Sequence, residues 1–93
     1  MTIIGRQLLN DFVYKDASVR SWIQSWLADV DAVKWRGPLD IRKRYAKVSF
    51  LSYNVAILDV KGSDCKLEVQ VAYNTGIIIV KWTGPDAKHN GRL

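Results

Sequence analysis

The stretch VRSWIQSWLADVDAV, residues 19–33, decides how the first half of this chain folds. Its apolar side chains recur in steps of three and four, which is the spacing of one face of an α-helix. Asp16 or Ser18 is expected to cap the start of this helix by accepting a hydrogen bond from an unpaired backbone amide. The apolar positions are Val19, Trp22, Ile23, Trp26, Leu27, Val30 and Val33. The polar residues expected to face water are Arg20, Gln24, Asp29 and Asp31. Since the two tryptophans lie among aliphatic neighbours, they are interpreted as core residues rather than as a platform for stacking bases.

Two further helices are predicted on either side of this stretch. Upstream, a helix follows the short β-prone segment 2–4. Its apolar positions, all on one side, are Leu8, Leu9, Phe12 and Val13. Downstream, Pro38 suits the first position of a helix, where its missing amide hydrogen costs nothing, and this helix is predicted to run to about Tyr45.

From residue 48 onward the pattern changes to short β-rich runs, at 48–51, 55–60, 65–73 and 77–83. The turns between them, at 53–54, 62–64 and 74–76, are too short for parallel crossovers. In the third run, apolar residues alternate with Lys66, Glu68, Gln70 and Ala72, so one face is expected to pack against helices and the other to meet water. The run 77–80 is apolar on both faces and is placed well inside the sheet or under the helices, and Trp82 is a candidate for closing the core.

These elements predict an α+β fold in which two to three N-terminal helices pack on an antiparallel β-meander sheet. A length of 93 residues suits one domain, spanning 1–93. Neither a secretory segment nor a membrane-spanning apolar run is present, so a cytoplasmic location without membrane contact is expected. With one cysteine, Cys65, and one histidine, His89, neither an internal disulfide nor a structural zinc site is expected. Cys65 is interpreted as a small buried side chain rather than as a nucleophile.

The formal net charge of +5 favours polyanionic partners, and one segment carries the excess. Residues 34–47 hold six basic residues and one acidic residue. A solvated charged helix is one interpretation. Contact with RNA is favoured, because guanidinium and ammonium groups pair with phosphate oxygens and acidic residues are nearly excluded from this segment. The candidate phosphate-contacting residues are Lys34, Arg36, Arg42, Lys43, Arg44 and Lys47.

The same segment carries a resemblance to a known family. The arrangement Trp-Arg-Gly-Pro-Leu-Asp-Ile-Arg at 35–42, then Tyr45, then Val-Ser-Phe-Leu at 48–51, resembles the Trp-x-x-Pro-x-x-Ile-Lys helix and Ala-Ser-x-Leu strand of the HigB toxins, a branch of the RelE-like toxins. The similarity runs along essentially the whole chain. This chain departs from the family in two motifs, at 62–67 and 84–90, where Lys66 stands in an arginine slot, Asp86 in a histidine slot and His89 in a tyrosine slot.

The resemblance implies RNA cleavage without a metal or other cofactor. In this chemistry a ribose 2′-hydroxyl is deprotonated and attacks the adjacent phosphate, while cations stabilise the developing charge and an acid assists the leaving oxygen. Lys66 would stabilise the phosphate, with Lys61 or Lys88 assisting as further RNA-contacting residues. His89 would transfer protons, because an unperturbed histidine titrates near neutrality, and Asp86 would act as a base or orient His89. Asp86 would also repel a phosphate.

Three functional hypotheses follow. The first is the toxin of a type II toxin–antitoxin system, a ribosome-dependent mRNA endonuclease whose partners are mRNA, the ribosome and a helix-turn-helix antitoxin that covers its basic surface. The second is a homologue that has lost cleavage and still binds the ribosome, RNA or the antitoxin. The third is a protein interaction module whose basic stretch pairs with an acidic partner.

Overall fold

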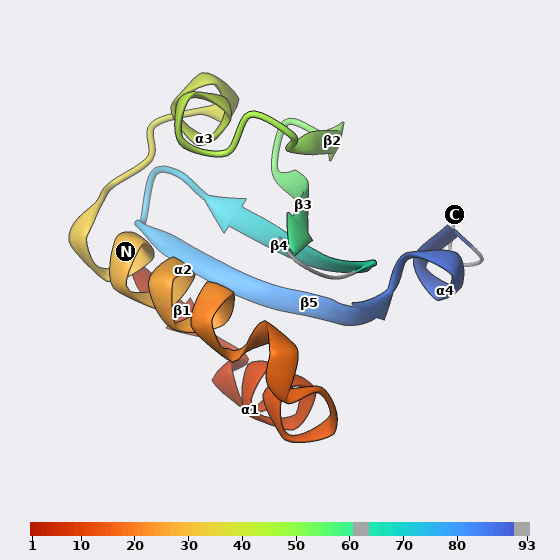
Figure 1. Cartoon of the computed structure of the whole chain (residues 1–93). Helices are drawn as coiled ribbons and strands as arrows, with labels where there is room; N and C mark the ends of the chain where they lie inside the picture. The colour runs from red at the N-terminus through yellow and green to blue at the C-terminus, as the bar shows by residue number, and fades with distance from the viewer. Residues whose placement is uncertain (61–63, 91–93) are drawn as a thin grey trace.

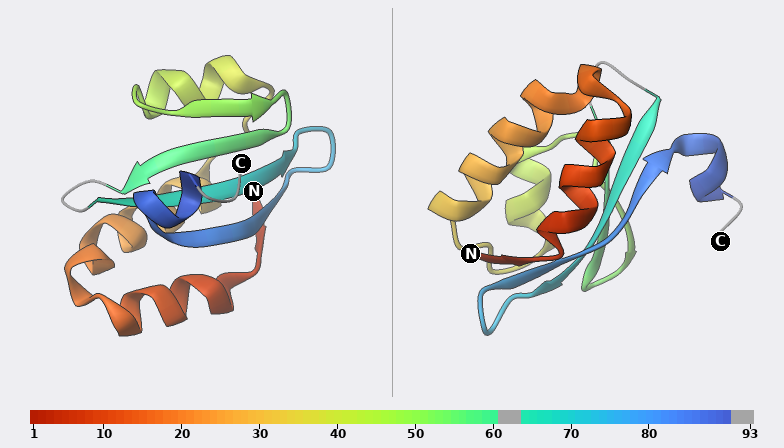
Figure 2. Two further views of the ribbon diagram at one scale, coloured as in Figure 1. Left: turned by 90° about the vertical axis from the view of Figure 1, so that its right-hand side faces the viewer. Right: turned by 90° about the horizontal axis from the view of Figure 1, so that it is seen from below.

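A five-stranded sheet with helices on both faces forms the molecule (Figure 1). The computed structural model describes residues 1–60 and 64–90, and the side chains of residues 1–60 and 64–88. The elements are β1 (Thr2–Ile4), α1 (Arg6–Lys15), the 3-10 turn η1 (Ala17–Val19), α2 (Arg20–Ala32), α3 (Pro38–Arg44), β2 (Ser49–Ser52), β3 (Val55–Val60), β4 (Cys65–Ala72), β5 (Ile77–Pro85) and α4 (Asp86–Asn90). In the right-hand view of Figure 2, α1 and α2 lie on one side of β4 and β5, and α4 lies on the other. The predicted α+β fold is confirmed.

The sheet has the strand order β1-β5-β4-β3-β2. Strands β2 to β5 form the predicted antiparallel meander. The β-prone segment at the N-terminus adds a fifth strand, because β1 runs parallel to β5 with Thr2 opposite Ile77 and Ile4 opposite Ile79. β5 is therefore flanked on both sides, which confirms that the apolar run 77–80 lies inside the sheet.

The helical stripe read from the sequence supplies the core. Ile23, Trp26 and Val30 of α2 are buried, and so are Leu9 and Phe12 of α1. The predicted side-chain cap is not found at α2 itself, whose N-cap residue is Val19; the Asp16 carboxylate instead accepts the Ser18 amide at 3.1 Å and caps the 3-10 turn ahead of α2. Leu8 lies at the margin of the stripe and is 40% exposed.

Two expectations about the sheet were wrong. Trp82 does not close the core, because a bulge shifts the β4–β5 register: Val69 faces Val80, but Glu68 faces Trp82. The extra residue, Lys81, moves Trp82 onto the face opposite the α1–α2 core. Glu68 was expected to meet water and is 8% exposed, because its neighbours across the two adjacent strands are the apolar Ile57 and Trp82.

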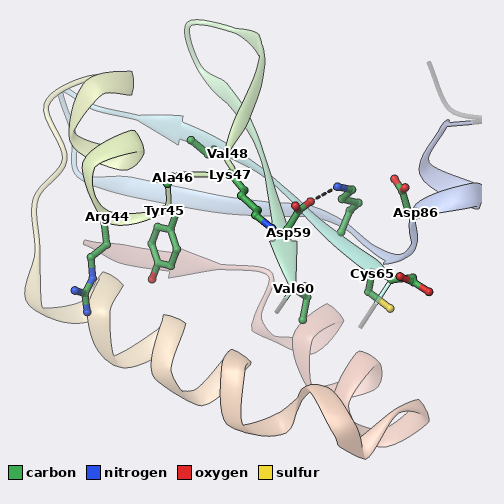
Figure 3. Close-up of a pocket in the computed structure, with 11 residues that line it drawn as sticks. Arg44, Tyr45, Ala46, Lys47, Val48, Asp59, Val60, Cys65 and Asp86 are labelled. Atoms are coloured by element: carbon green, nitrogen blue, oxygen red, sulfur yellow. Dashed lines mark hydrogen bonds and ion pairs between the residues drawn. The ribbon is translucent and has the colours of Figure 1, made fainter. Parts of the chain in front are cut away.

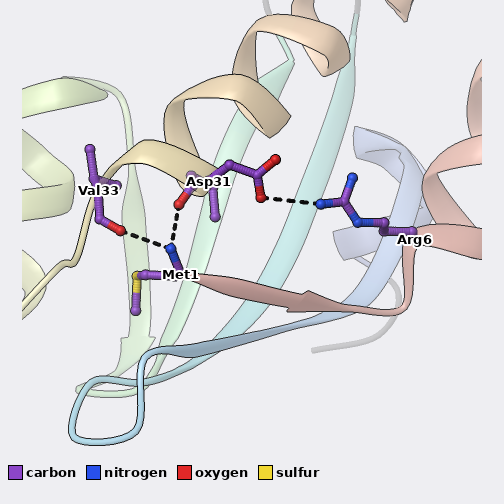
Figure 4. A network of polar contacts seen from close by, with 5 residues as sticks. Met1, Arg6, Asp31 and Val33 are labelled. Carbon is purple, nitrogen blue, oxygen red and sulfur yellow. Dashed lines mark hydrogen bonds and ion pairs between the residues drawn. The ribbon is translucent and has the colours of Figure 1, made fainter.

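The first residues of the chain are tied to the end of α2 (Figure 4). The Met1 α-amino group donates to the carbonyl oxygens of Val30 and Val33, at 2.7 and 2.9 Å. A cation is favourable there because unpaired carbonyls give a helix C-terminus a partial negative charge. Arg6 donates to Asp31 of α2 at 3.2 Å. These contacts hold β1 and α1 against α2.

Gly5 makes a close approach that a side chain would obstruct. Its φ is +93°, and a Cβ there would meet the Val80 carbonyl oxygen at 3.0 Å. Gly76 also has positive φ, +71°, but its Cβ would meet nothing within 4 Å. We predict that Gly76→Ala lowers the free energy of unfolding by about 1–2 kcal/mol, the cost of left-handed backbone alone. Gly5→Ala should lower the free energy of unfolding by clearly more than Gly76→Ala does, as measured by urea titration. An equal loss of unfolding free energy in the two variants would show that the close approach of Gly5 to Val80 does not exclude a side chain.

Candidate functional site

An open cleft of about 660 Å³ lies between the α3–β2 connection and the adjoining ends of β3 and β4 (Figure 3). This volume is within the range typical of ligand sites. The side chains and backbone that line it belong to Arg44, Tyr45, Ala46, Lys47, Val48, Asp59, Val60, Asp64, Cys65, Lys66 and Asp86. Segments far apart in sequence therefore meet here, and two of the three predicted catalytic residues, Lys66 and Asp86, are among them.

The antiparallel pairing of β3 with β4 positions Lys66. Asp59 is its direct partner across the two strands, and the Lys66 ammonium forms an ion pair with the Asp59 carboxylate. The side chains of Lys66 and Asp59 are 25% and 38% exposed, so the pair remains open to the cleft. Lys66 also faces Gly84 on β5, and the Trp82 ring lies over that glycine.

Asp86 reaches the same cleft from the end of β5, which lies beside the start of β4 because Pro85 pairs with Cys65. It is the first residue of α4, and its backbone amide donates to the Asp64 carbonyl oxygen at 2.7 Å. This bond ties the start of α4 to the segment that leads into β4. His89 also belongs to α4, but its side chain lies outside the described part of the structure. Lys88 is exposed on α4 and does not line the cleft. Lys61 lies outside the described residues.

The cleft holds as many described carboxylates as cations. Asp59, Asp64 and Asp86 accompany Arg44, Lys47 and Lys66. In Figure 3, Lys47 points toward Asp59, whereas Arg44 points toward α2. Cys65 lines the cleft and is half-buried, not fully buried as expected. Among the described side chains, no group of three or more His, Cys, Asp and Glu is placed to hold a metal ion.

Asp29 keeps 26% of its side chain exposed, and it clamps the end of α3 to α2. Its carboxylate accepts two bonds from the Arg44 guanidinium, at 2.8 and 2.9 Å, and one from the Tyr45 hydroxyl at 2.8 Å. The bonds from Arg44, followed by the bond from Tyr45, lower the pKa of Asp29 below its usual value. Burial and the bond to Asp29 raise the pKa of Tyr45. Arg44 is thereby held to Asp29.

The other members of the basic segment lie in different directions. Arg42 stacks on the Phe50 ring of β2, with its guanidinium carbon 5.6 Å from the ring centre. Lys34, Arg36 and Lys43 are exposed and lie outside the cleft, and only Arg44 and Lys47 line it. The structure therefore separates residues that the sequence presents as one cationic surface.

Asp59 and Asp64 line the cleft, although neither was predicted from the sequence as a site residue. A signal for Asp59 was present: the expected hairpin between the runs 55–60 and 65–73 places residue 59 close to residue 66 across the two strands. A similar signal existed for Asp64 and Asp86, because a hairpin that turns at residues 74–76 places residue 64 opposite residue 86.

The Asp29 clamp generates a prediction about stability and pH. A carboxyl whose pKa is lowered by folding stabilises the protein above its unfolded pKa, and this stabilisation is lost as pH falls through the folded pKa. Asp29→Asn should therefore be less stable than wild type at pH 7, with the gap narrowing as pH falls below the ordinary value of 3.8. The difference in stability between wild type and Asp29→Asn is measured from urea unfolding midpoints at several pH values between 7 and 2. Asp31→Asn removes only the exposed ion pair with Arg6. This variant should therefore lower the free energy of unfolding at pH 7 by less, at most about 1 kcal/mol. A gap for Asp29→Asn that stays constant with pH would contradict the proposed clamp.

Comparison with known proteins supplies the family. A family model described as HigB toxin, the RelE-like toxic component of a toxin–antitoxin system, matches residues 19–90. A search of curated proteins gave no match. No helix among the described residues combines the length and apolar composition that a membrane crossing needs. The match covers α2, α3, the meander and α4, and so includes every described element of the cleft. Because the matched region spans well over half of its length, the chain belongs to the HigB toxin family, whose RelE-like members are the toxic components of toxin–antitoxin systems, and an antitoxin is its partner.

Proposed function

We propose that this toxin is a ribosome-dependent mRNA endonuclease that inhibits translation and cleaves at the cleft between α3 and the sheet. One observation carries the proposal: Lys66 and Asp86, which the family resemblance assigned to catalysis, line the same cleft although they belong to different elements. A cation and a carboxylate in one cleft are the two kinds of group that attack by a ribose hydroxyl on a phosphate requires.

The proposed step uses the RNA's own 2′-hydroxyl as nucleophile. The Asp86 carboxylate removes the hydroxyl proton, and the oxygen attacks the adjacent phosphorus. The bond to the 5′-oxygen of the next nucleotide breaks, leaving a cyclic 2′,3′-phosphate and a free 5′-hydroxyl. Lys66 stabilises the charge that develops on the phosphate oxygens. His89, three residues after Asp86, donates the proton to the departing oxygen.

Asp59 has a positioning role in this proposal. Its carboxylate holds the Lys66 ammonium at the cleft before RNA arrives and takes part of its charge. With three carboxylates beside three cations, the described part of the cleft has no net attraction for a phosphate chain. Binding must therefore come from elsewhere, which fits an enzyme that receives its mRNA already held by the ribosome.

The experiment is primer extension on an mRNA translated in a purified system. Wild type should give codon-linked cuts, and Lys66→Ala should reduce the cleavage rate by about 10²-fold, as expected for loss of a group that stabilises transition-state charge. Lys15→Ala, on an exposed position of α1, should cut like wild type. If wild type gives no cuts where an active homologue does, the endonuclease proposal fails.

The rival proposal is a toxin that binds the ribosome or RNA without cutting, and the ion pair between Asp59 and Lys66 favours it, because a neutralised lysine is a weaker phosphate ligand. Primer extension separates the two proposals, and Asp59→Asn tests the contact between Lys66 and phosphate on which both depend. The variant frees a cation, so affinity for single-stranded RNA should rise and the slope of log K against log salt should steepen by about 0.7. Asp11→Asn, an exposed position on α1, should change neither. Unchanged salt dependence for Asp59→Asn would show that Lys66 does not contact phosphate.

A further inference from the structure

We propose that the antitoxin binds the outward surface of the segment around α3, through acidic side chains that flank an apolar one. We call this surface the α3 ridge and define it as Lys34, Arg36, Leu39 and Lys43. The inference rests on the family's antitoxin partner and does not require that the toxin cleaves mRNA. It also separates antitoxin binding from the cleft, since no residue of the ridge lines the cleft.

Leu39 is the apolar centre of the ridge. It is 71% exposed, whereas Ile41 on the opposite side of the same helix is 0% exposed. Lys43 lies one turn further along and is also exposed. The helix that presents them is fixed at both sides, by the contact of Arg42 with Phe50 and by the bonds from Arg44 to Asp29. Leu39 is therefore held out in water on a rigid support, as residues at protein interfaces often are.

The segment that leads into α3 carries two further cations. Lys34 and Arg36 are exposed and flank Trp35, which is buried. Within the described part of the chain, the side chains of Lys34, Arg36 and Lys43 form neither a hydrogen bond nor an ion pair. The one acidic residue of the segment, Asp40, is already engaged, because its carboxylate accepts the Arg36 backbone amide at 2.9 Å.

This combination selects a polypeptide over RNA. A phosphate chain would pair with the three cations and leave Leu39 in water. A polypeptide with acidic residues around an apolar side chain would form ion pairs with the cations and at the same time bury Leu39. Tyr53, 62% exposed, enlarges the apolar area, because its hydroxyl lies 3.5 Å from where a Cβ of Gly37 would be, at the start of α3. The antitoxin is the polypeptide partner that the family provides.

The test measures binding of the protein encoded by the gene adjacent to this toxin's gene, purified and titrated into the toxin by calorimetry. Leu39→Asp and the double variant Arg36→Glu/Lys43→Glu should each raise Kd at least 10-fold. Leu39 is the second residue of α3, so an aspartate there suits the helix dipole and should leave folding intact, which thermal unfolding checks. The matched controls are Leu8→Asp, in the first turn of α1, and Lys15→Glu, and both should bind like wild type. In the left view of Figure 2, α1 lies at the opposite end of the molecule from α3.

A second measurement separates this inference from the proposed function. Lys66→Ala should keep full affinity for the antitoxin while losing cleavage, and Leu39→Asp should remain toxic in cells that also express the antitoxin. If wild type fails to cleave mRNA, the calorimetric result still stands, so the two proposals can fail independently. The inference is overturned if Leu39→Asp binds the adjacent gene product like wild type. It is also overturned if the ridge variants lose salt-dependent RNA binding instead.

Discussion

The Asp29 carboxylate fixes the position of the basic segment at residues 34–47 relative to α2. By accepting bonds from Arg44 and Tyr45, it fixes the C-terminal end of α3 to α2, whose other side is packed in the core. Arg42 on Phe50 fixes the same helix to β2. A helix of only seven residues has little intrinsic stability in water, so these contacts, with Ile41 in the core and Pro38 at the first position, define its orientation. Everything that α3 presents depends on that orientation.

One short segment thereby contributes to two surfaces of different character. Its outward side carries the α3 ridge, with Leu39 between cations that the rest of the described chain leaves unpaired. Its C-terminal end forms a wall of the cleft, where half of the described charged groups are acidic and Lys66 is paired with Asp59. Such a compensated cleft suits a site that acts on RNA delivered by a larger partner, because strong attraction to free RNA is not needed there. Net charge alone therefore does not locate the cleft.

The sequence alone determined the local elements. Steps of three and four identified α1 and α2, Pro38 marked the start of α3, and alternation with turn residues identified the four strands of the meander. These features depend on neighbours within a few residues, and they also carried the family resemblance. Lys66 and Asp86 were named from the sequence, and the expected antiparallel hairpin around residues 74–76 brings both to one end of the sheet.

Only the tertiary structure decided which distant segments meet. It placed β1 beside β5, moved Trp82 out of the core through the bulge at Lys81, and paired Asp29 of α2 with Arg44 at the end of α3. It also paired Asp59 with Lys66 and divided the basic segment between a cleft and a ridge. The reason is physical: periodicity states which side of an element is apolar, but strand register and packing of helix on sheet select the partner of each polar side chain. That selection minimises the free energy of the whole chain and is not encoded in any single stretch.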